Sequence, residues 1–217
     1  MNRYDLIWLK RMRNWAGLLG GLLPLISLAG AWIYASVQGV PDGFWYGLSV
    51  SETYFVTPAL AGILTAASLV LVCYKGYVWE DNLVTTLSGV FGLGIVLFPC
   101  SCPVAGDRVG FFQLPIGASN IVHSVSAVTF FLLLAYNDVF LFTRTNKKEP
   151  GRMKRIRNII YYVCGAGMAL GAVLLIIPVD FPAKIWWAEL VMLLFFSFSW
   201  LVKGDAFPFL NDRSSHD

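Results

Sequence analysis

Charged residues are scarce in this sequence. Asp, Glu, Lys and Arg together make up 13% of the 217 residues, whereas a soluble domain carries about a quarter. Hydrophobic residues reach 57%. This composition excludes an ordinary soluble domain and indicates an integral membrane protein.

The residue types that usually bind metals are also few. The chain has two histidines and four cysteines, whereas a zinc site takes several His or Cys ligands. No glycine-rich phosphate loop, Gly-x-Ser-x-Gly elbow or His-Glu-x-x-His motif occurs in the sequence. We therefore expect no resident metal and no cofactor.

Apolar residues occur in blocks of bilayer length, separated by polar connectors. The blocks predict an all-α bundle of six transmembrane helices that forms a single domain over residues 1–217. The expected spans are residues 15–37, 54–74, 83–98, 120–143, 158–177 and 184–202. The third block is slightly short for a full crossing, so a re-entrant or core segment is the alternative there.

The positions of Lys and Arg predict the orientation, because positive residues are retained on the cytoplasmic side. With six spans and the N-terminus inside, 14 of the 16 basic residues fall in cytoplasmic segments. The other two are Arg108 and Lys184. Both termini are therefore expected in the cytoplasm, and the first block is expected to stay as an anchor rather than to be cleaved as a signal peptide.

The connector from Arg144 to Arg157 is the most basic segment of the chain. Neither aromatic interleaving nor a nucleic-acid motif accompanies its positive charges. We therefore expect no nucleic-acid partner and expect anionic lipid headgroups to bind this cytoplasmic loop. The sequence leaves open which protein partners, if any, the chain has.

Small residues four positions apart mark helix faces that can pack closely in a membrane. Such pairs occur in four of the expected spans. They are Gly17 and Gly21, Gly62 and Ala66, Ser88 and Gly92, and Gly167 and Gly171. Pro24 is expected to kink the first span.

Few ionisable side chains fall inside or beside the apolar blocks. A charge within the bilayer costs about 2.5–3.5 kcal/mol on insertion scales, so each such group needs a partner. The groups are Glu52, His123, Asp138 and Glu189. In the six-span arrangement Asp138 lies near the cytoplasmic end and the other three lie near the outer interface.

A polar pocket at the outer leaflet is the functional hypothesis for these groups. Its candidate catalytic residues are Ser51, Glu52, His123 and Glu189, with His123 as general acid or base and a carboxylate orienting it. We expect His123 to contact Glu52, directly or through one water, because an unpaired buried polar group costs about 1–3 kcal/mol. The sequence leaves open whether the protein is an enzyme.

Three further residues are expected to contact this pocket or a lipid within it. Ser119 and Ser126 share a helical face with His123. Gln113 follows two aromatic anchors, Phe111 and Phe112, and is expected to hydrogen-bond into the pocket.

A second hypothesis involves no catalysis. The same polar groups can be interhelical clasps in a membrane scaffold or regulatory component.

The four cysteines fall into two groups. Cys100 and Cys102 lie at the outer end of the third span, and a bond between cysteines so close in sequence is strained. We expect both to react with an impermeant thiol reagent, directly or after mild reduction. Cys73 and Cys164 are expected to be small packing residues inside their spans.

Four short motifs, SVSETY (49–54), LFP (97–99), GFFQ (110–113) and HSVSA (123–127), lie within residues 49–142, less than half of the chain. Together they resemble the six-span DRAM-type proteins, a group that includes autophagy modulators and a factor in lipid remodelling of GPI anchors. The family often has Thr-Gly after its Ser-acidic pair, whereas Tyr54 follows Thr53 here. The resemblance implies a six-helix fold and lipid handling. Short outer loops and the absence of eukaryotic targeting signals favour a bacterial inner membrane.

Overall fold

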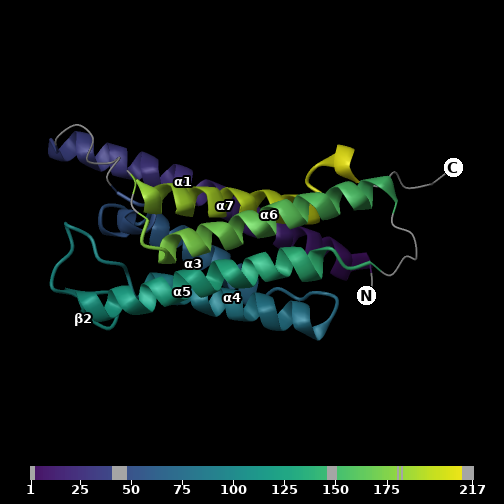
Figure 1. Cartoon of the computed structure of the whole chain (residues 1–217), viewed down its shortest axis with the longest axis horizontal. Helices are drawn as coiled ribbons and strands as arrows, with labels where there is room; N and C mark the ends of the chain where they lie inside the picture. The colour runs from purple at the N-terminus through teal and green to yellow at the C-terminus, as the bar shows by residue number, and fades with distance from the viewer. Residues whose placement is uncertain (1–2, 41–47, 146–150, 180, 182, 212–217) are drawn as a thin grey trace.

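The protein is an all-α bundle in the computed structural model, which describes residues 3–40, 48–145, 151–179, 181 and 183–211 (Figure 1). Its α-helices are α1 (Arg3–Gln38), α3 (Ala59–Val72), α4 (Trp79–Leu97), α5 (Ile116–Tyr136), α6 (Arg152–Ile176) and α7 (Lys184–Lys203). The shorter elements are the 3-10 helices η1 (Ser51–Phe55) and η3 (Pro208–Leu210), the π-helix η2 (Asn137–Phe142), and an antiparallel hairpin of β1 (Arg108–Val109) and β2 (Leu114–Pro115).

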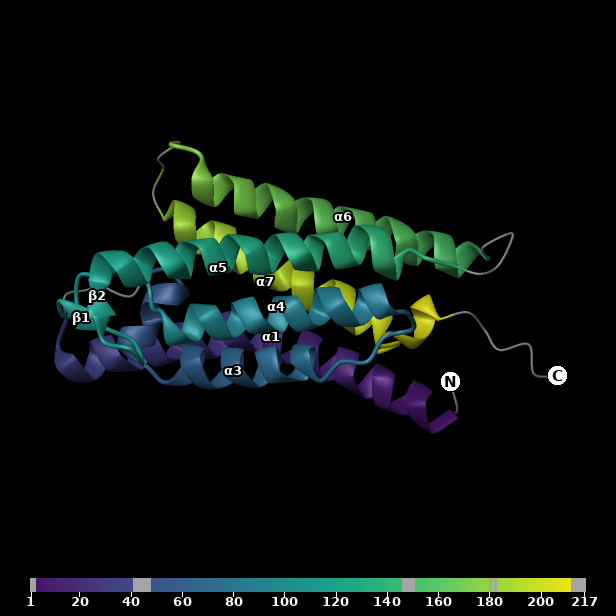
Figure 2. The ribbon, with the colours of Figure 1, turned by 90° about the horizontal axis from the view of Figure 1, so that it is seen from below.

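The α-helices form a ring in which each one packs mainly against two others. The order around the ring is α1, α3, α4, α5, α6 and α7, and α7 returns to α1. Figure 2 shows α3, α4 and α5 side by side along one side of this ring. Consecutive helices run in opposite directions along the long axis of the bundle (Figure 1).

Four helical segments in the described part of the chain are long and apolar enough to cross a membrane. They are Tyr4–Gln38, Ile116–Phe142, Arg152–Ile176 and Lys184–Lys203. α3 is apolar but has 14 residues, which gives a length of about 21 Å at 1.5 Å per residue, less than the hydrocarbon core. The four long segments are typical of a multi-pass membrane protein.

The outer surface of these helices is apolar. Leu25 on α1, Ile121 on α5 and Leu170 on α6 each expose more than 60% of their surface. A soluble bundle carries charged and polar residues on this outer face. An apolar exterior is therefore consistent with contact between these helices and lipid.

The second apolar block folds differently from a single long helix. The expected span began at Tyr54, but α3 begins at Ala59, directly after Pro58. Proline fixes φ and has no N–H, so it favours a helix start over a helix interior. The residues before Pro58 form η1, and this turn presents Ser51 and Glu52 at the end of the bundle. α1, in contrast, continues through Pro24.

Large side chains fill the interior of the ring. Phe130, Phe196 and Trp200 are at most 2% exposed. The ring of Phe196 lies 6.4 Å from that of Phe130 and 5.5 Å from that of Trp200, so aromatic contacts connect α5 to α7 across the core.

Small residues permit close helix packing at most of the expected positions. A Cβ added at Gly21 or Gly171 would lie within 3.0 Å of α7 side chains, and one at Gly92 would lie equally close to α3. Gly62 is different, because nothing lies within 4 Å of such a Cβ. The pairing of Gly62 with Ala66 therefore marks no interface in this bundle, and that expectation is wrong.

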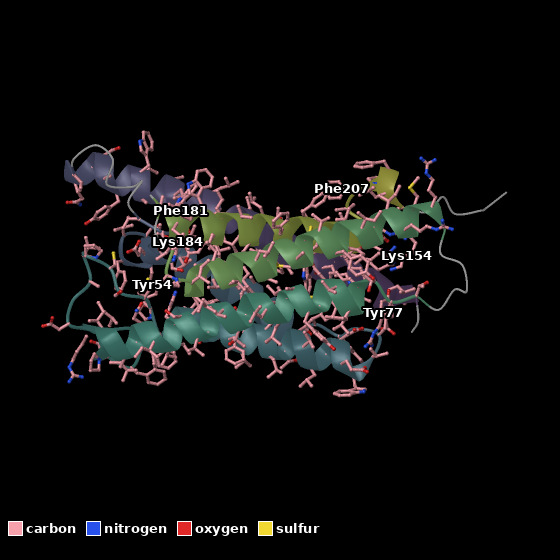
Figure 3. All side chains as sticks on the ribbon, in the orientation of Figure 1. Tyr54, Tyr77, Lys154, Phe181, Lys184 and Phe207 are labelled. Atoms are coloured by element: carbon pink, nitrogen blue, oxygen red, sulfur yellow. The ribbon has the colours of Figure 1, made fainter. Side chains whose placement is uncertain are left out.

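The two ends of the bundle carry different groups. Tyr54, Phe181 and Lys184 lie at the end that carries η1 and the β-hairpin, here called the hairpin end (Figure 3). Tyr77 and Lys154 lie at the opposite end, here called the basic end.

A buried arginine connects several elements at the basic end. Arg13 is 3% exposed, and its Nε and Nη2 donate to the Tyr74 hydroxyl at 3.0 and 2.8 Å. Its Nη1 donates to the Lys203 carbonyl at 3.4 Å. The Nζ atoms of Lys203 and Lys154 donate to the Phe142 carbonyl at 2.8 and 3.0 Å. These bonds join α1 to the α3–α4 connector and α7, and join α6 and α7 to η2.

Candidate functional site

A cleft of about 390 Å³ lies at the hairpin end. η1, the segment after α4, α5, the end of α6 and the start of α7 all contribute to it. Its polar lining residues are Ser49, Ser51, Glu52, Cys100, Ser101, Asn120, His123, Ser124 and Glu189. Its apolar lining residues are Ala127, Val128, Leu175, Ile176 and Ile185.

The structure brings together the four residues that were expected to form an outer pocket. Ser51, Glu52, His123 and Glu189 come from three separate elements, and all line the cleft. Their catalytic roles stay a prediction.

Hydrogen bonds attach η1 to α7. The Ser51 backbone N–H donates to Glu189 Oε2 at 3.2 Å, and the Ser51 hydroxyl donates to Glu189 Oε1. Glu189 is 8% exposed, so these bonds satisfy part of a buried carboxylate. Ser51 and Glu189 therefore hold the wall of the cleft together as well as lining it.

Glu52 is held by a reciprocal pair of bonds within its own turn. The Ser49 backbone N–H donates to Glu52 Oε2 at 2.6 Å, and the Glu52 backbone N–H donates to Ser49 Oγ at 3.2 Å. A serine and a glutamate three residues apart give this arrangement in a capping box. The spacing is visible in the sequence, and it could have identified Ser49 as a cleft residue.

His123 contacts α4 rather than Glu52. Its Nδ1 lies 3.0 Å from the Phe98 carbonyl oxygen and 3.3 Å from the Ile95 carbonyl oxygen. A carbonyl only accepts, so Nδ1 carries the hydrogen and Nε2 is the acceptor of the neutral ring. The direct bond expected between His123 and Glu52 does not occur among the described contacts. The last carbonyls of α4 have no helical partner, and they take the ring N–H instead.

Gln113 lies outside the cleft. Its φ is 51°, and its Nε2 donates to the Gly110 carbonyl at 2.9 Å. The backbone carbonyl of Gln113 accepts a bond from Arg108 Nη1. The side chain therefore stabilises the β1–β2 turn. The structure does not bring Gln113 to the cleft, and its expected contact with a lipid stays a prediction.

Ser119 and Ser126 are packing residues between α5 and α4. The Ser119 hydroxyl donates to the Pro99 carbonyl at 2.8 Å, and Ser126 lies against Gly94. Both serines are buried and neither lines the cleft. The structure does not bring these serines to the cleft, because this stripe of α5 faces its neighbouring helix, and their expected contact with a lipid stays a prediction.

A different stripe of α5 faces the cleft. Asn120, Ser124, Ala127 and Val128 line it together with His123, and this spacing places them on one helical face. Asn120 also accepts the Ser101 backbone N–H at 2.9 Å, which fixes the segment after α4. The polar residues at 120 and 124 were the sequence signal for this face.

The cysteines differ from expectation in exposure. Cys100 and Cys102 are buried free thiols, and Cys73 is exposed at the end of α3. Burial raises the pKa of Cys100, and the nearby Glu189 and Glu52 carboxylates raise this pKa further. A protonated thiol is a poor nucleophile, so the structure does not favour rapid labelling of Cys100.

Asp138 is not part of the cleft. It is fully buried in η2 and lies against Gly165 of α6. The described residues contain no group of three or more His, Cys, Asp or Glu that could hold a metal ion. The cleft is therefore the candidate site.

Comparisons with protein-family models, with curated proteins and with solved structures find no match to this chain. The resemblance to DRAM-type proteins stays a prediction. The geometry of the cleft is the observation from which a function can be proposed.

Proposed function

We propose that the chain is a six-span membrane protein whose cleft binds the headgroup of a membrane lipid in the outer leaflet. The observation that carries this proposal is the two-sided lining of the cleft. Carboxylates, hydroxyls, an amide and an imidazole form part of the wall, and Leu175, Ile176 and Ile185 form another part. Such a wall suits an amphipathic ligand, because it offers polar partners beside apolar surface.

An apolar recess adjoins the cleft and supports the same proposal. Ser51, Ala127, Leu175 and Glu189 line both spaces. The recess is narrow, at about 30 Å³, and its other lining residues are Leu23, Val50, Leu60, Leu64, Ile95, Phe130, Phe131 and Leu193. The recess has room for about one small apolar group, so it extends the apolar part of the cleft wall only slightly towards the core.

The distribution of basic residues supports an outer position for the cleft. The chain order places Arg108 and Lys184 at the hairpin end and the other described basic residues towards the basic end. By the positive-inside rule, the basic end faces the cytoplasm and both termini lie there. We propose a bacterial inner membrane as the location. Lys147 and Lys148, part of the proposed lipid-attracting loop, lie outside the described residues.

Reporter fusions test this orientation. Fusions after Lys148 and after Asp217 are expected to report the cytoplasm, and a fusion near Asp107 the opposite side, because retention of positive charge sets the insertion. The activities of paired alkaline phosphatase and fluorescent-protein fusions report on which side of the membrane each fusion point lies. A signal from the far side at Lys148 contradicts six spans and removes the outer cleft.

Blocking the cleft tests lipid binding. Ser124→Trp places an indole in the cleft, whereas Val125→Trp places one on the adjacent residue, which is 58% exposed and does not line the cleft. Native mass spectrometry of the gently purified protein is expected to show bound lipid reduced roughly tenfold in Ser124→Trp, a loss of about 1.4 kcal/mol. Val125→Trp is expected to retain it. Equal retention in both variants argues against the proposal.

The alternative is a scaffold without a ligand. His123, Ser119 and Ser51 each bond across to another segment, as interhelical clasps do. In a scaffold, Ser124→Trp leaves co-purified lipid unchanged, while His123→Gln lowers only stability. If the site also transfers protons, His123 Nε2 is the ring atom that would accept one.

A further inference from the structure

Two carboxyl groups line the cleft from different sides. Glu52 enters from η1 and Glu189 from α7, and the described lining residues include no lysine or arginine. Residues 41–47, 180 and 182, whose structure is not described, contain no lysine or arginine in the sequence. A buried carboxylate such as Glu189 is costly unless a proton or a cation compensates its charge, and Glu52 lines the same cleft from a partly buried position.

The two basic residues of the hairpin end have other partners. Lys184 Nζ donates to the Ile177 carbonyl at 2.9 Å, and Arg108 Nη1 donates to the Gln113 carbonyl at 2.9 Å. Neither side chain lines the cleft. An anionic headgroup in the cleft would therefore meet neutral donors only, such as Ser101, Ser124 and Asn120.

The carboxylates retain capacity to accept further bonds. A carboxylate offers about four lone-pair sites, and a primary ammonium offers three N–H donors. In the described contacts the Glu52 side chain accepts one bond from Ser49, and Glu189 accepts two bonds from Ser51 and a further one from the Val50 backbone N–H. Both oxygen pairs can therefore accept charge-assisted bonds from a ligand, which are about twice as strong as neutral ones.

We infer that the cleft selects a lipid headgroup that carries a primary ammonium group, with Glu52 and Glu189 as its recognition residues. This inference rests on the proposed lipid binding and names the class of headgroup. The ammonium would lie between the two carboxylates, and the phosphodiester would take the neutral donors of α5 and the segment after α4. Cys100 lies beside both carboxyl groups: burial raises the pKa of its thiol most, and the Glu189 and Glu52 carboxylates raise it further.

Three lipids with identical acyl chains separate the contribution of the headgroup's positive charge from that of its N–H donors. Phosphatidylethanolamine has an ammonium with N–H donors, phosphatidylcholine has a quaternary ammonium without them, and phosphatidylglycerol has neither. In native mass spectrometry titrations of the delipidated full chain, we expect phosphatidylethanolamine to bind roughly tenfold more tightly than phosphatidylglycerol, with phosphatidylcholine between them. Free ethanolamine tests whether a soluble amine can replace the lipid, and we expect no competition at lipid-equivalent concentrations.

Substitution of each carboxylate tests the assigned residues. Glu52→Gln and Glu189→Gln are each expected to reduce the preference for phosphatidylethanolamine to roughly twofold or less, because an amide accepts neutral bonds only. Glu80→Gln is the matched control, since Glu80 lies 3.8 Å from Arg144 at the basic end, and it is expected to leave the preference unchanged. Glu52 is only partly buried, so its variant keeps the test informative if Glu189→Gln fails to fold.

The outcomes distinguish this inference from the proposal on which it rests. Equal affinity for the three lipids, with all three weakened by Ser124→Trp, overturns the ammonium preference and leaves lipid binding in place. A preference that survives both glutamine variants overturns the assignment of Glu52 and Glu189. If Ser124→Trp leaves the affinity for all three lipids unchanged, both the lipid site and its selectivity are overturned. Full competition by free ethanolamine identifies a soluble amine as the ligand and overturns the lipid headgroup.

Discussion

Gly89→Leu is expected to lower the stability of the bundle severely, whereas Gly62→Leu is expected to leave it unchanged or slightly raised. A Cβ at position 89 would lie 2.5 Å from the Ser68 carbonyl oxygen and 2.9 Å from the Val72 nitrogen. These are backbone atoms of α3, so the clash can be relieved only by moving the helix. Overpacking of this kind costs about 3 kcal/mol or more. A Cβ at position 62 meets nothing within 4 Å.

The two substitutions form a matched pair. Each adds the same side chain to an apolar helix, and each gains about 0.8 kcal/mol of helix propensity. Thermal unfolding in detergent, followed by circular dichroism, measures the difference. Similar midpoints for Gly89→Leu and the native protein would show that α3 and α4 do not pack as closely as described.

Arg13→Ala is expected to lower the stability of the bundle strongly, second only to Gly89→Leu among these substitutions. It removes both bonds to the Tyr74 hydroxyl and the bond to the Lys203 carbonyl, and it empties a buried position. Hydrogen bonds to charged groups contribute about 1.5–3 kcal/mol each, and relief of repulsion from Lys203 offsets part of the loss. We expect a net loss of about 3 kcal/mol in the free energy of unfolding.

A neighbouring arginine gives the control for this prediction. Arg11 is exposed and lies over the Trp8 ring at 5.7 Å, so Arg11→Ala is expected to change stability by less than about 0.5 kcal/mol. Arg13→Lys is expected to fall between the two alanine variants, because one ammonium does not reproduce the planar fork of donors. Unfolding titrations in mixed detergent micelles measure all three. A loss at Arg11 that equals the loss at Arg13 would contradict the role of the buried bonds.

The helices were predictable because each requires a long apolar block, and a block of that length has few alternative structures. The local exception was the turn at residues 51–55, where Pro58 delays α3. The block length alone predicted continuous helix there. Pro58 favours a helix start, and α3 begins at the residue directly after it.

The site was predictable at the level of which residues meet, and less so at the level of bonds. Topology placed Glu52, His123 and Glu189 at one end, and all three line the cleft. The partner of His123 is a backbone carbonyl at Phe98, and no pattern of side chains in the sequence encodes it. Ser119 was assigned to the pocket because helical phase identifies a polar face but does not say which neighbour that face meets.

The closure of the ring by α1 and α7 has a consequence for the order of assembly. The other helix pairs in the ring are consecutive in sequence, so each can form as soon as its second helix has been made. The face of α1 around Gly17 and Gly21 packs against α7, the last helix of the ring to be synthesised. That face must therefore remain in contact with lipid or with assembly factors throughout translation. The first helix of the ring in sequence is therefore among the last to complete its packing.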